Sequence, residues 1–501
     1  MQAILRLPFL VILMGLGAIA MLIPSIHGWR IGDFEAMRVF GYSGILVFLL
    51  AAMVGVASVN YNPRYTVRSH LVALLMAFLG LPVFLALPIY FLTDGPSLFS
   101  LYFEMVSCLT TTGATLFPGA GDLGEAEHLW RALVGWMGGF LILISVTAIL
   151  APLNLGGFEV FAEKREAVAR GITQIQAADA STRLVRWTVR LGPPYFAATI
   201  LLALGILFSG ERVFTAAILA MSTLSTSGIT AGAGFETLDL SFFAEFMVFL
   251  FLFFAVSRSV LDFRRAGRSF SSVVLGREFR TVWTFLIIVT TVLFLRHLLG
   301  SLDQEGAGSL SQALGALWGD LFTTMSFLTT TGFQSSYWAT AQEWSGQSSP
   351  VILLLGLSAM GGGVATTSGG IKLLRLFALY KHGQREVQKL IYPSSVIGAA
   401  GTSRYIRREG AWIAWMFFML FAISTALVML AMALFGHGLA DSMAYAVAAL
   451  ATTGPMANAV LGEAYVSLGD GEKAILALAM VVGRLETLAI IALFNPEFWR
   501  A

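Results

Sequence analysis

Long apolar runs alternate with short polar stretches along almost the whole chain. Ten runs are long enough to cross a hydrocarbon core about 30 Å thick, because an α-helix rises about 1.5 Å per residue. They cover residues 3–26, 40–59, 69–93, 129–154, 184–208, 241–262, 281–300, 350–380, 410–435 and 473–494. The pattern therefore predicts ten membrane-spanning helices.

Four shorter apolar stretches lie between the later spans, at residues 97–109, 211–224, 311–328 and 438–451. They are too short to cross a bilayer and suit helices that enter partway and turn back. We therefore expect an all-α membrane protein with four helix–half-helix–helix units behind two extra N-terminal spans. The expected boundaries are 1–65 for the two N-terminal helices and 66–158, 159–265, 266–400 and 401–501 for the four repeats.

Composition supports a membrane protein. Of 501 residues, 57% are apolar and 12% are charged, whereas soluble domains carry about 25% charged residues. This excludes a large soluble enzyme, and the one cysteine, Cys108, excludes a disulfide framework. The first apolar run follows Arg6 and has no small-residue cleavage site after it, so we interpret it as a spanning helix rather than a signal peptide.

Charge is distributed unevenly between the loops. Segments 60–70, 155–190, 258–280 and 372–408 hold 22 of the 31 Lys and Arg residues. Segments 94–127, 301–349 and 436–472 hold none, but contain 13 of the 29 acidic residues. The positive-inside rule predicts that the basic loops face the cytoplasm and the half-helix loops face outward. The acidic outer face would concentrate cations, although ordinary surface loops can also be acidic.

One short polar string recurs after each of the four half-helices, and its glycines are 115, 104 and 122 residues apart. Such recurrence indicates a repeated unit. We number the strings one to four: Thr110-Thr111-Thr112-Gly113-Ala114, Ser225-Thr226-Ser227-Gly228-Ile229, Thr329-Thr330-Thr331-Gly332-Phe333 and Ala451-Thr452-Thr453-Gly454-Pro455.

Non-helical backbone at membrane depth is tolerated where it is buried in protein or lines a wet cavity. Four such strings can meet around one axis, and their carbonyl oxygens can then replace the water shell of a cation. Glycine suits a position where the backbone needs a positive φ. The alternative is that each string only caps a helix C-terminus. Glu104, in the first half-helix, either supports a string from behind or caps helices, and the sequence leaves this open.

Residues 350–380 cannot form one straight helix. Five glycines and three hydroxyl residues lie within residues 361–370, and each glycine costs about 1 kcal/mol in a helix interior. We expect an unwound loop there, although a packing seam of small residues is the alternative. Arg484 lies in an apolar run, where a charge costs at least ~2.5 kcal/mol. Arg484 is either a functional residue or a structural one. A structural arginine would extend its charge to the membrane surface or pair with a group on another helix.

These features resemble the Trk/Ktr/HKT superfamily of potassium transporters, and most closely its bacterial TrkH-type pore subunit. The two extra N-terminal spans favour the TrkH type over the shorter Ktr type. Besides the strings, the resemblance rests on Trp136-Met137-Gly138-Gly139, Met360-Gly361-Gly362-Gly363, Ser368-Gly369-Gly370-Ile371-Lys372, Gly483-Arg484-Leu485-Glu486 and Phe494-Asn495-Pro496-Glu497-Phe498-Trp499-Arg500.

The resemblance implies four M1–P–M2 units around one pore, a homodimer, K⁺ as the transported ion with no covalently bound cofactor, and the bacterial cytoplasmic (inner) membrane. It also implies a cytoplasmic nucleotide-binding regulatory subunit of the TrkA type, for which segments 163–190, 258–280 and 381–408 are the expected docking face. The implied K⁺ filter positions are Thr111, Thr112, Gly113, Thr226, Ser227, Gly228, Thr330, Thr331, Gly332, Thr452, Thr453 and Gly454.

The same resemblance implies a gate under the filter, formed by an intramembrane loop and a pore-facing arginine. The gate positions are Gly361, Gly362, Gly363, Val364, Ala365, Thr366, Thr367, Ser368 and Arg484. Thr366 and Thr367 replace smaller residues usual in the family, so the loop is expected to be stiffer. Plant relatives that prefer sodium have serine for the first filter glycine, and the glycines here argue for potassium. Ser227 and Ile229 depart from the usual string.

We therefore expect channel-like potassium uptake. The alternative is a potassium symporter coupled to H⁺ or Na⁺, which would normally use an intramembrane carboxylate or histidine relay; we recognise none in the sequence. The chain also has no HExxH motif, phosphate-binding glycine loop or nucleophile–base set. An enzyme is therefore not expected, and neither is a nucleic-acid partner.

Overall fold

The computed structural model describes residues 8–58, 66–150, 180–232, 234–257, 277–302, 310–346, 349–391, 408–462 and 465–485. The regular elements within these ranges are all helices, which confirms the predicted all-α class. Seven helical segments have the length and apolar character needed to cross a membrane. They are Phe9–Ile31, Phe34–Ser58, Leu71–Leu92, Glu125–Ile149, Arg183–Phe208, Phe279–Ser301 and Gly410–Leu434.

The other three predicted spans are present as shorter described helices. The span predicted at 241–262 is α10 (Phe242–Leu252) with a 3₁₀ turn at Phe253–Ala255. The span predicted at 473–494 is α20 (Asp470–Leu485), and its last predicted residues lie outside the described ranges. The span predicted at 350–380 is divided into α15 (Val351–Met360) and α16 (Leu373–Ile391).

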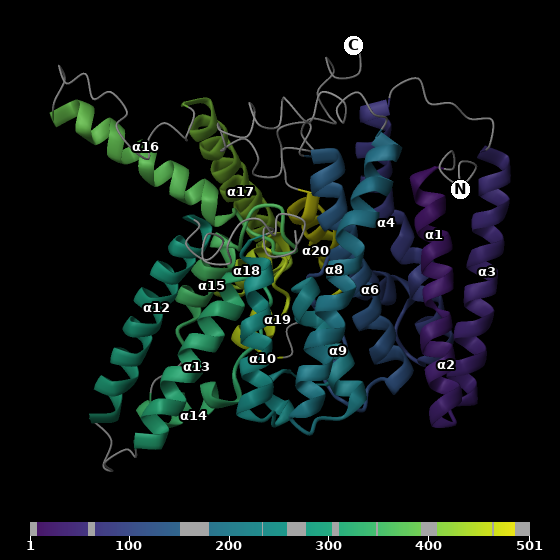
Figure 1. The fold of residues 1–501 in the computed structure, drawn as a ribbon, viewed down its shortest axis with the longest axis horizontal. Coiled ribbons are helices and arrows are strands. Elements are labelled where there is room, and N and C mark those ends of the chain that lie inside the picture. Colours follow the sequence, from purple (N-terminus) through teal and green to yellow (C-terminus); the bar gives the residue numbers. More distant parts are fainter. Residues whose placement is uncertain are drawn as a thin grey trace.

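The first predicted span is present as one helical segment, Phe9–Ile31, with a local break. Residues predicted as one span at 3–26 form α1 (Phe9–Ala20) and α2 (Leu22–Ile31), joined at Met21. Pro24 explains the junction, because proline has no N–H to donate to the preceding turn. Helix α2 then ends at Gly32, whose left-handed φ of 84° suits glycine. Together with α3 (Phe34–Ser58) these helices lie at one edge of the molecule (Figure 1).

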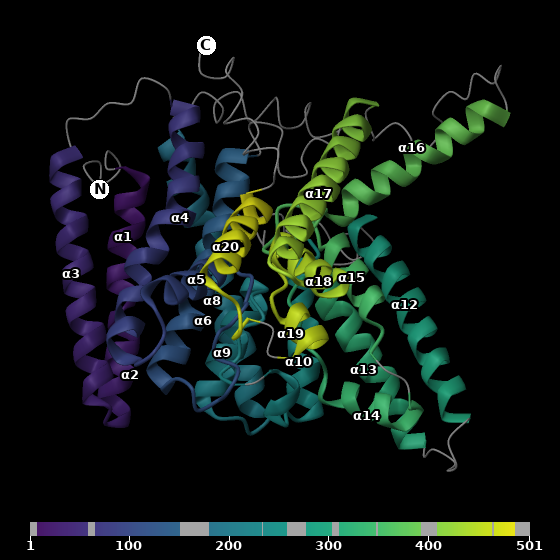
Figure 2. The ribbon, with the colours of Figure 1, turned by 180° about the vertical axis from the view of Figure 1, so that it is seen from behind.

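The remaining helices follow the predicted helix–half-helix–helix order four times. The first repeat is α4 (Thr66–Leu92), α5 (Leu98–Leu109) and α6 (Glu125–Ser145), and the second is α8 (Ala180–Phe208), α9 (Val213–Ser225) and α10. The third is α12 (Arg277–Leu302), α13 (Leu310–Leu328) and α15–α16, and the fourth is α17 (Arg408–Leu434), α18 (Leu439–Leu450) and α20. Helix α20 packs against α5, so the fourth repeat contacts the first (Figure 2).

Two helices were not predicted. Helix α14 (Ser336–Ser345) follows the third string, and the Ser335 side chain caps its N-terminus. Helix α19 (Pro455–Leu461) follows the fourth string and begins with proline, a residue suited to the first helical turn. Helix α16 extends away from the helical bundle after the break in the third repeat (Figure 1).

The segments expected to dock a regulatory partner, 163–190, 258–280 and 381–408, lie largely outside the described residues.

Candidate ion-conducting site

Each polar string follows directly on a half-helix and is tied back to it. The N–H of the third residue of every string donates to a carbonyl oxygen five residues earlier, at 2.8–3.0 Å. These bonds join Thr112 to Ser107, Ser227 to Ser222, Thr331 to Ser326 and Thr453 to Ala448. Since these bonds use N–H groups, they leave the carbonyl oxygens of the same residues free for other partners.

The second residue of every string has the same unusual backbone conformation. Thr111, Thr226, Thr330 and Thr452 have φ angles of 54°, 53°, 61° and 53°. The left-handed region is rare for a β-branched residue, and it costs roughly 1–2 kcal/mol for residues with a Cβ. The same strain at four equivalent positions indicates that the surrounding fold imposes one common string geometry.

The string glycines have the expected conformation in three of the four strings. Gly113, Gly228 and Gly332 have φ angles of 74°, 67° and 82°. Gly454 has a φ of −55°, so the expectation of a positive φ is wrong for string four. The physical reason is that Pro455 begins α19, which draws Gly454 into helical geometry.

The four strings lie side by side in a closed cycle. A Cβ built on Gly113 would be 1.9 Å from the Ser227 carbonyl oxygen, and one built on Gly228 would be 2.2 Å from that of Thr331. One built on Gly332 would be 3.2 Å from a Thr453 methyl group, and one on Gly454 would be 2.1 Å from the Ala114 nitrogen. The Gly454 N–H also donates to the Thr112 carbonyl oxygen at 2.5 Å. The strings are therefore neighbours in the order one, two, three, four, one.

The break in the third repeat, the intramembrane loop (residues 361–372), packs against two strings and one half-helix. The Gly369 N–H donates to the Thr330 hydroxyl at 2.8 Å, and the Thr367 hydroxyl donates to the Leu224 carbonyl oxygen at 3.1 Å. A Cβ on Gly369 would be 2.1 Å from the Ala451 carbonyl oxygen. The structure thus places the predicted unwound loop directly beside strings three and four and beside the end of α9, just before string two.

Two buried cations hold the intramembrane loop by neighbouring carbonyl oxygens. Arg484 Nη1 donates to the Thr367 oxygen at 2.6 Å, and Lys372 Nζ donates to the Ser368 oxygen. Arg484 is 4% exposed, so it does not snorkel to the membrane surface. Its Nε and Nη2 have no hydrogen-bond partner among the described residues. Arg484 therefore joins the fourth repeat to the broken helix of the third.

Glycines in the second helices allow the half-helices to come close. A Cβ on Gly138 of α6 would be 2.0 Å from the Leu109 carbonyl oxygen, the last residue before string one. A Cβ on Gly483 of α20 would be 2.2 Å from the equivalent oxygen of Leu450, before string four. By this register, Arg484 occupies the position in repeat four that Gly139 occupies in repeat one.

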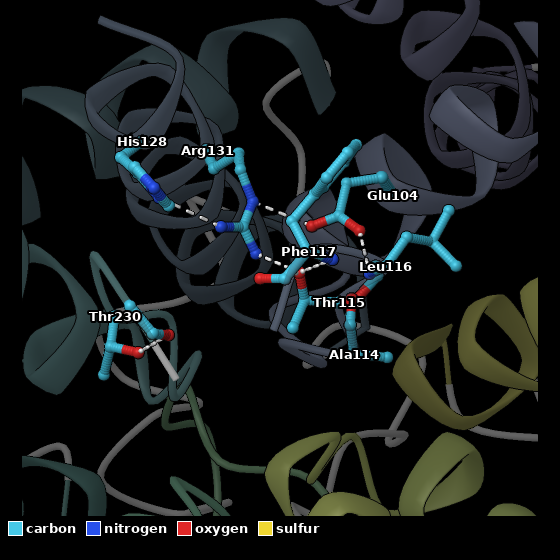
Figure 3. A network of polar contacts seen from close by, with 10 residues as sticks. Glu104, Ala114, Thr115, Leu116, Phe117, His128, Arg131 and Thr230 are labelled. Carbon is cyan, nitrogen blue, oxygen red and sulfur yellow. Dashed lines mark hydrogen bonds and ion pairs between the residues drawn. The ribbon is translucent and has the colours of Figure 1, made fainter. Parts of the chain in front are cut away.

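Glu104 supports the segment after string one. Its carboxylate accepts from Arg131 Nε and from the Leu116 N–H, both at 2.8 Å, as Figure 3 shows. Arg131 also donates to the Thr115 hydroxyl at 2.6 Å and contacts His128. Glu104 and Arg131 are buried, so this ion pair favours the supporting role that the sequence left open. It does not cap a helix.

Two further buried acidic groups were missed from the sequence. Glu245 accepts hydrogen bonds near string three from Trp318, Ser335 and Ser336. Only its place near the start of an apolar run could have marked it, because its partners are far away in sequence.

Asp320 of α13 lies 3.6 Å from His297 of α12, and both side chains are fully buried. No carboxylate or histidine relay was recognised in the sequence, and the structure brings together one such pair that had not been singled out there. A histidine and an aspartate inside apolar stretches were the available signal.

Together, the fold and the four adjoining strings define a multi-pass membrane transport protein rather than an enzyme. The chain belongs to the TrkH family of cation transport proteins, whose family model matches residues 45–500. This confirms the predicted family and the predicted absence of an enzymatic function.

Relatives and a solved structure agree with this assignment. The chain is 29% identical to the Trk system potassium uptake protein TrkH of Salmonella typhimurium, over 83% of this chain and 82% of that one. It is also 29% identical to TrkH of Halomonas elongata, over 91% and 92%. The crystal structure of the potassium transporter TrkH from Vibrio parahaemolyticus has the same fold, with a TM-score of 0.76, 24% identity and full coverage of both chains.

Proposed function

We propose that this protein takes up potassium through one pore, in which the four strings form a selectivity filter. The observation that carries the proposal is the closed cycle of strings, each with the same strained threonine and most with a left-handed glycine. Carbonyl oxygens from such a cycle can replace the hydration shell of a monovalent cation. The potassium transport named for the relatives supports K⁺ as the ion.

String four is the weakest contributor to this filter. The Thr453 and Gly454 carbonyl oxygens accept N–H groups of α19 at 3.1 Å, and the Thr112 oxygen accepts from Gly454. Fewer oxygens of strings four and one are then available to an ion. Selectivity would therefore depend most on strings two and three, together with Gly113.

The intramembrane loop is the proposed gate. Hydrogen bonds from residue 367 to the end of α9 and from residue 369 to string three hold it against the filter, and Arg484 adds a positive charge at the same place. A fixed cation beneath a cation filter opposes ion passage by charge repulsion. Displacement of the loop from these contacts would open the pore.

Uptake through such a pore is driven by the membrane potential. Moving one charge across 100 mV is worth ~2.3 kcal/mol, which is enough to accumulate K⁺ without a reaction in this chain. The buried His297–Asp320 pair favours a second candidate, potassium uptake coupled to H⁺ or Na⁺. Reversal potentials of the purified protein separate the two, because an uncoupled pore follows the K⁺ gradient alone.

The proposed setting is the bacterial cytoplasmic membrane, with the basic loops inside. The protein would act as a homodimer with one pore per protomer and would be controlled by a nucleotide-binding regulatory subunit of the TrkA type. The name "Trk system" of the relatives supports a multicomponent assembly. Co-purification with such a subunit, followed by measurement of flux with and without it, tests this part.

The experiment that tests the function is rubidium uptake into liposomes with competing ions. Excess external K⁺ should suppress ⁸⁶Rb⁺ uptake strongly, whereas the same concentration of Na⁺ should have little effect. Equal competition by the two ions would contradict a potassium filter. Liposomes without protein provide the background.

A further inference from the structure

A buried carboxylate of the second repeat reaches across to the third string. Glu245 lies in the first turn of α10 and is fully buried. Its Oε2 accepts from Trp318 Nε1 and from the Ser335 hydroxyl, and its Oε1 accepts from the Ser336 N–H, all at 2.8 Å. Hydrogen bonds to a charged acceptor are stronger than those between neutral groups. One side chain thus joins α10, α13 and the segment that leaves string three.

The contacts of Glu245 fix the point at which string three ends. Ser335 and Ser336 are three and four residues after Gly332. Ser335 is also the N-cap of α14, and its own N–H donates to Thr323 of α13 at 3.3 Å. The string is therefore held at both ends, by α13 before it and by Glu245 after it. Without Glu245, the segment at 335–336 would lose two hydrogen bonds that no neighbouring carboxylate replaces in the described contacts.

String one has an equivalent support made from different residues. Leu116 is three residues after Gly113, and its N–H donates to Glu104. Glu104 lies on the half-helix of the same repeat and is neutralised by Arg131, whereas Glu245 comes from the preceding repeat and is surrounded by neutral donors. Two carboxylates from different places in the fold therefore both accept a backbone N–H shortly after a string glycine. This argues that the backbone after a filter glycine must be held in a fixed position.

We propose that Glu245 is a positioning residue for the filter: it sets the position of string three and thereby the preference for K⁺ over Na⁺. The inference rests on the proposed function, because it assigns the string a role in ion selection. Carbonyl oxygens select an ion by their number and placement, so releasing one end of a string should change selectivity before it changes folding. Glu245 itself does not touch the ion.

The test compares Glu245→Gln with Trp318→Phe and Glu343→Gln in purified full-length protein. Glu245→Gln replaces one acceptor oxygen with a donor, so at least one of the three bonds is lost. Trp318→Phe removes one donor but leaves the carboxylate bound to Ser335 and Ser336. Glu343 is an exposed acidic residue on α14, the helix that follows string three, so Glu343→Gln is the matched control for loss of an acidic charge near that string.

The readouts are ⁸⁶Rb⁺ uptake with competing K⁺ or Na⁺, the KM and maximal rate for Rb⁺, and the thermal unfolding temperature. We expect Glu245→Gln to reduce the preference for K⁺ over Na⁺ about tenfold, the effect of losing one charge-assisted hydrogen bond. Its KM for Rb⁺ should rise more than its maximal rate falls. Trp318→Phe should change selectivity much less, and Glu343→Gln should behave as wild type.

Unchanged selectivity and KM in folded Glu245→Gln would overturn the inference, while a selective wild type would leave the proposed function standing. An unselective wild type would contradict the proposed function itself. If Glu245→Gln does not fold, the inference is judged on Ser335→Ala, which removes one bond to the carboxylate together with the cap bond that the Ser335 hydroxyl accepts from the Tyr337 N–H. A wild-type K⁺ preference in Ser335→Ala would then also overturn it.

Discussion

The first and third repeats share one plan but differ in their second helix. In the first repeat, α6 runs unbroken from Glu125 to Ser145, with Gly138 against the end of its half-helix. In the third repeat, the helix stops at Met360 and resumes at Leu373, and the loop between them contacts strings three and four and the end of α9. The segments after strings one and three are both held by a buried carboxylate. In the proposed function, repeat one therefore only holds the filter, whereas repeat three both holds the filter and supplies the gate.

The largest expected effect is at Gly113, the most crowded of the four string glycines. Gly113→Ser should abolish the preference for K⁺, so that Rb⁺ and Na⁺ enter liposomes at about equal rates, because carbonyl placement determines selectivity. The added Cβ would lie 1.9 Å from the Ser227 oxygen. Gly332→Ser should have a smaller effect, since its nearest contact would be 3.1 Å away.

The control for both serine variants is Gly80→Ser. Gly80 lies in α4, and a Cβ there would meet no atom within 4 Å. Wild-type selectivity in Gly113→Ser, measured by sodium competition against ⁸⁶Rb⁺ uptake, would contradict the assignment of string one to the filter.

The next effect concerns the loop that distinguishes repeat three. Deleting residues 364–368 removes the Thr367 and Ser368 contacts to Leu224, Arg484 and Lys372. Basal ⁸⁶Rb⁺ uptake should rise about a hundredfold if these contacts contribute roughly 3 kcal/mol to closure. The filter should stay selective, and this serves as the internal control. Lower uptake by a monodisperse, folded variant would contradict the gate.

A smaller effect is expected at Arg484, the residue of repeat four that donates a hydrogen bond to the intramembrane loop. Arg484→Gln should raise basal uptake about tenfold, because a charged hydrogen bond to the loop contributes roughly 1.5–3 kcal/mol. Arg212→Gln is the control, since Arg212 pairs with Glu125 through an exposed side chain. The measurement is again ⁸⁶Rb⁺ uptake, and equal rates in wild type and Arg484→Gln would remove Arg484 from the gate.

The smallest effect compares equivalent threonines of strings one and three. The Thr330 hydroxyl accepts the Gly369 N–H of the loop, whereas the Thr111 hydroxyl has no partner among the described residues. Thr330→Val should therefore raise basal uptake about fivefold, the value of one hydrogen bond of ~1 kcal/mol. Thr111→Val should not. Equal effects of the two variants would show that the loop does not depend on string three.

Much of this arrangement could be predicted from local sequence. Apolar runs located the spans, and repetition located the strings, because both are properties of contiguous residues. The glycines at 361–370 revealed the broken helix in the same way. The half-helices were placed to within a few residues, since each ends at a string that cannot continue a helix.

Other features could not be predicted, because they depend on contacts between distant segments. Glu245 and Ser336 are 91 residues apart, and His297 and Asp320 meet only once α12 packs on α13. The negative φ of Gly454 depends on whether Pro455 begins a helix, which the string motif does not specify. The strings could therefore be recognised from the sequence alone, whereas the buried side chains that support them could be identified only from the tertiary structure.

Anomalous diffraction from crystals of this protein grown with Tl⁺ or Rb⁺ would show directly whether the four strings bind a monovalent cation. Anomalous density is expected within the cycle of strings, between the backbone oxygens around Gly113, Gly228 and Gly332. Density at the His297–Asp320 pair with none among the strings would contradict the proposed filter.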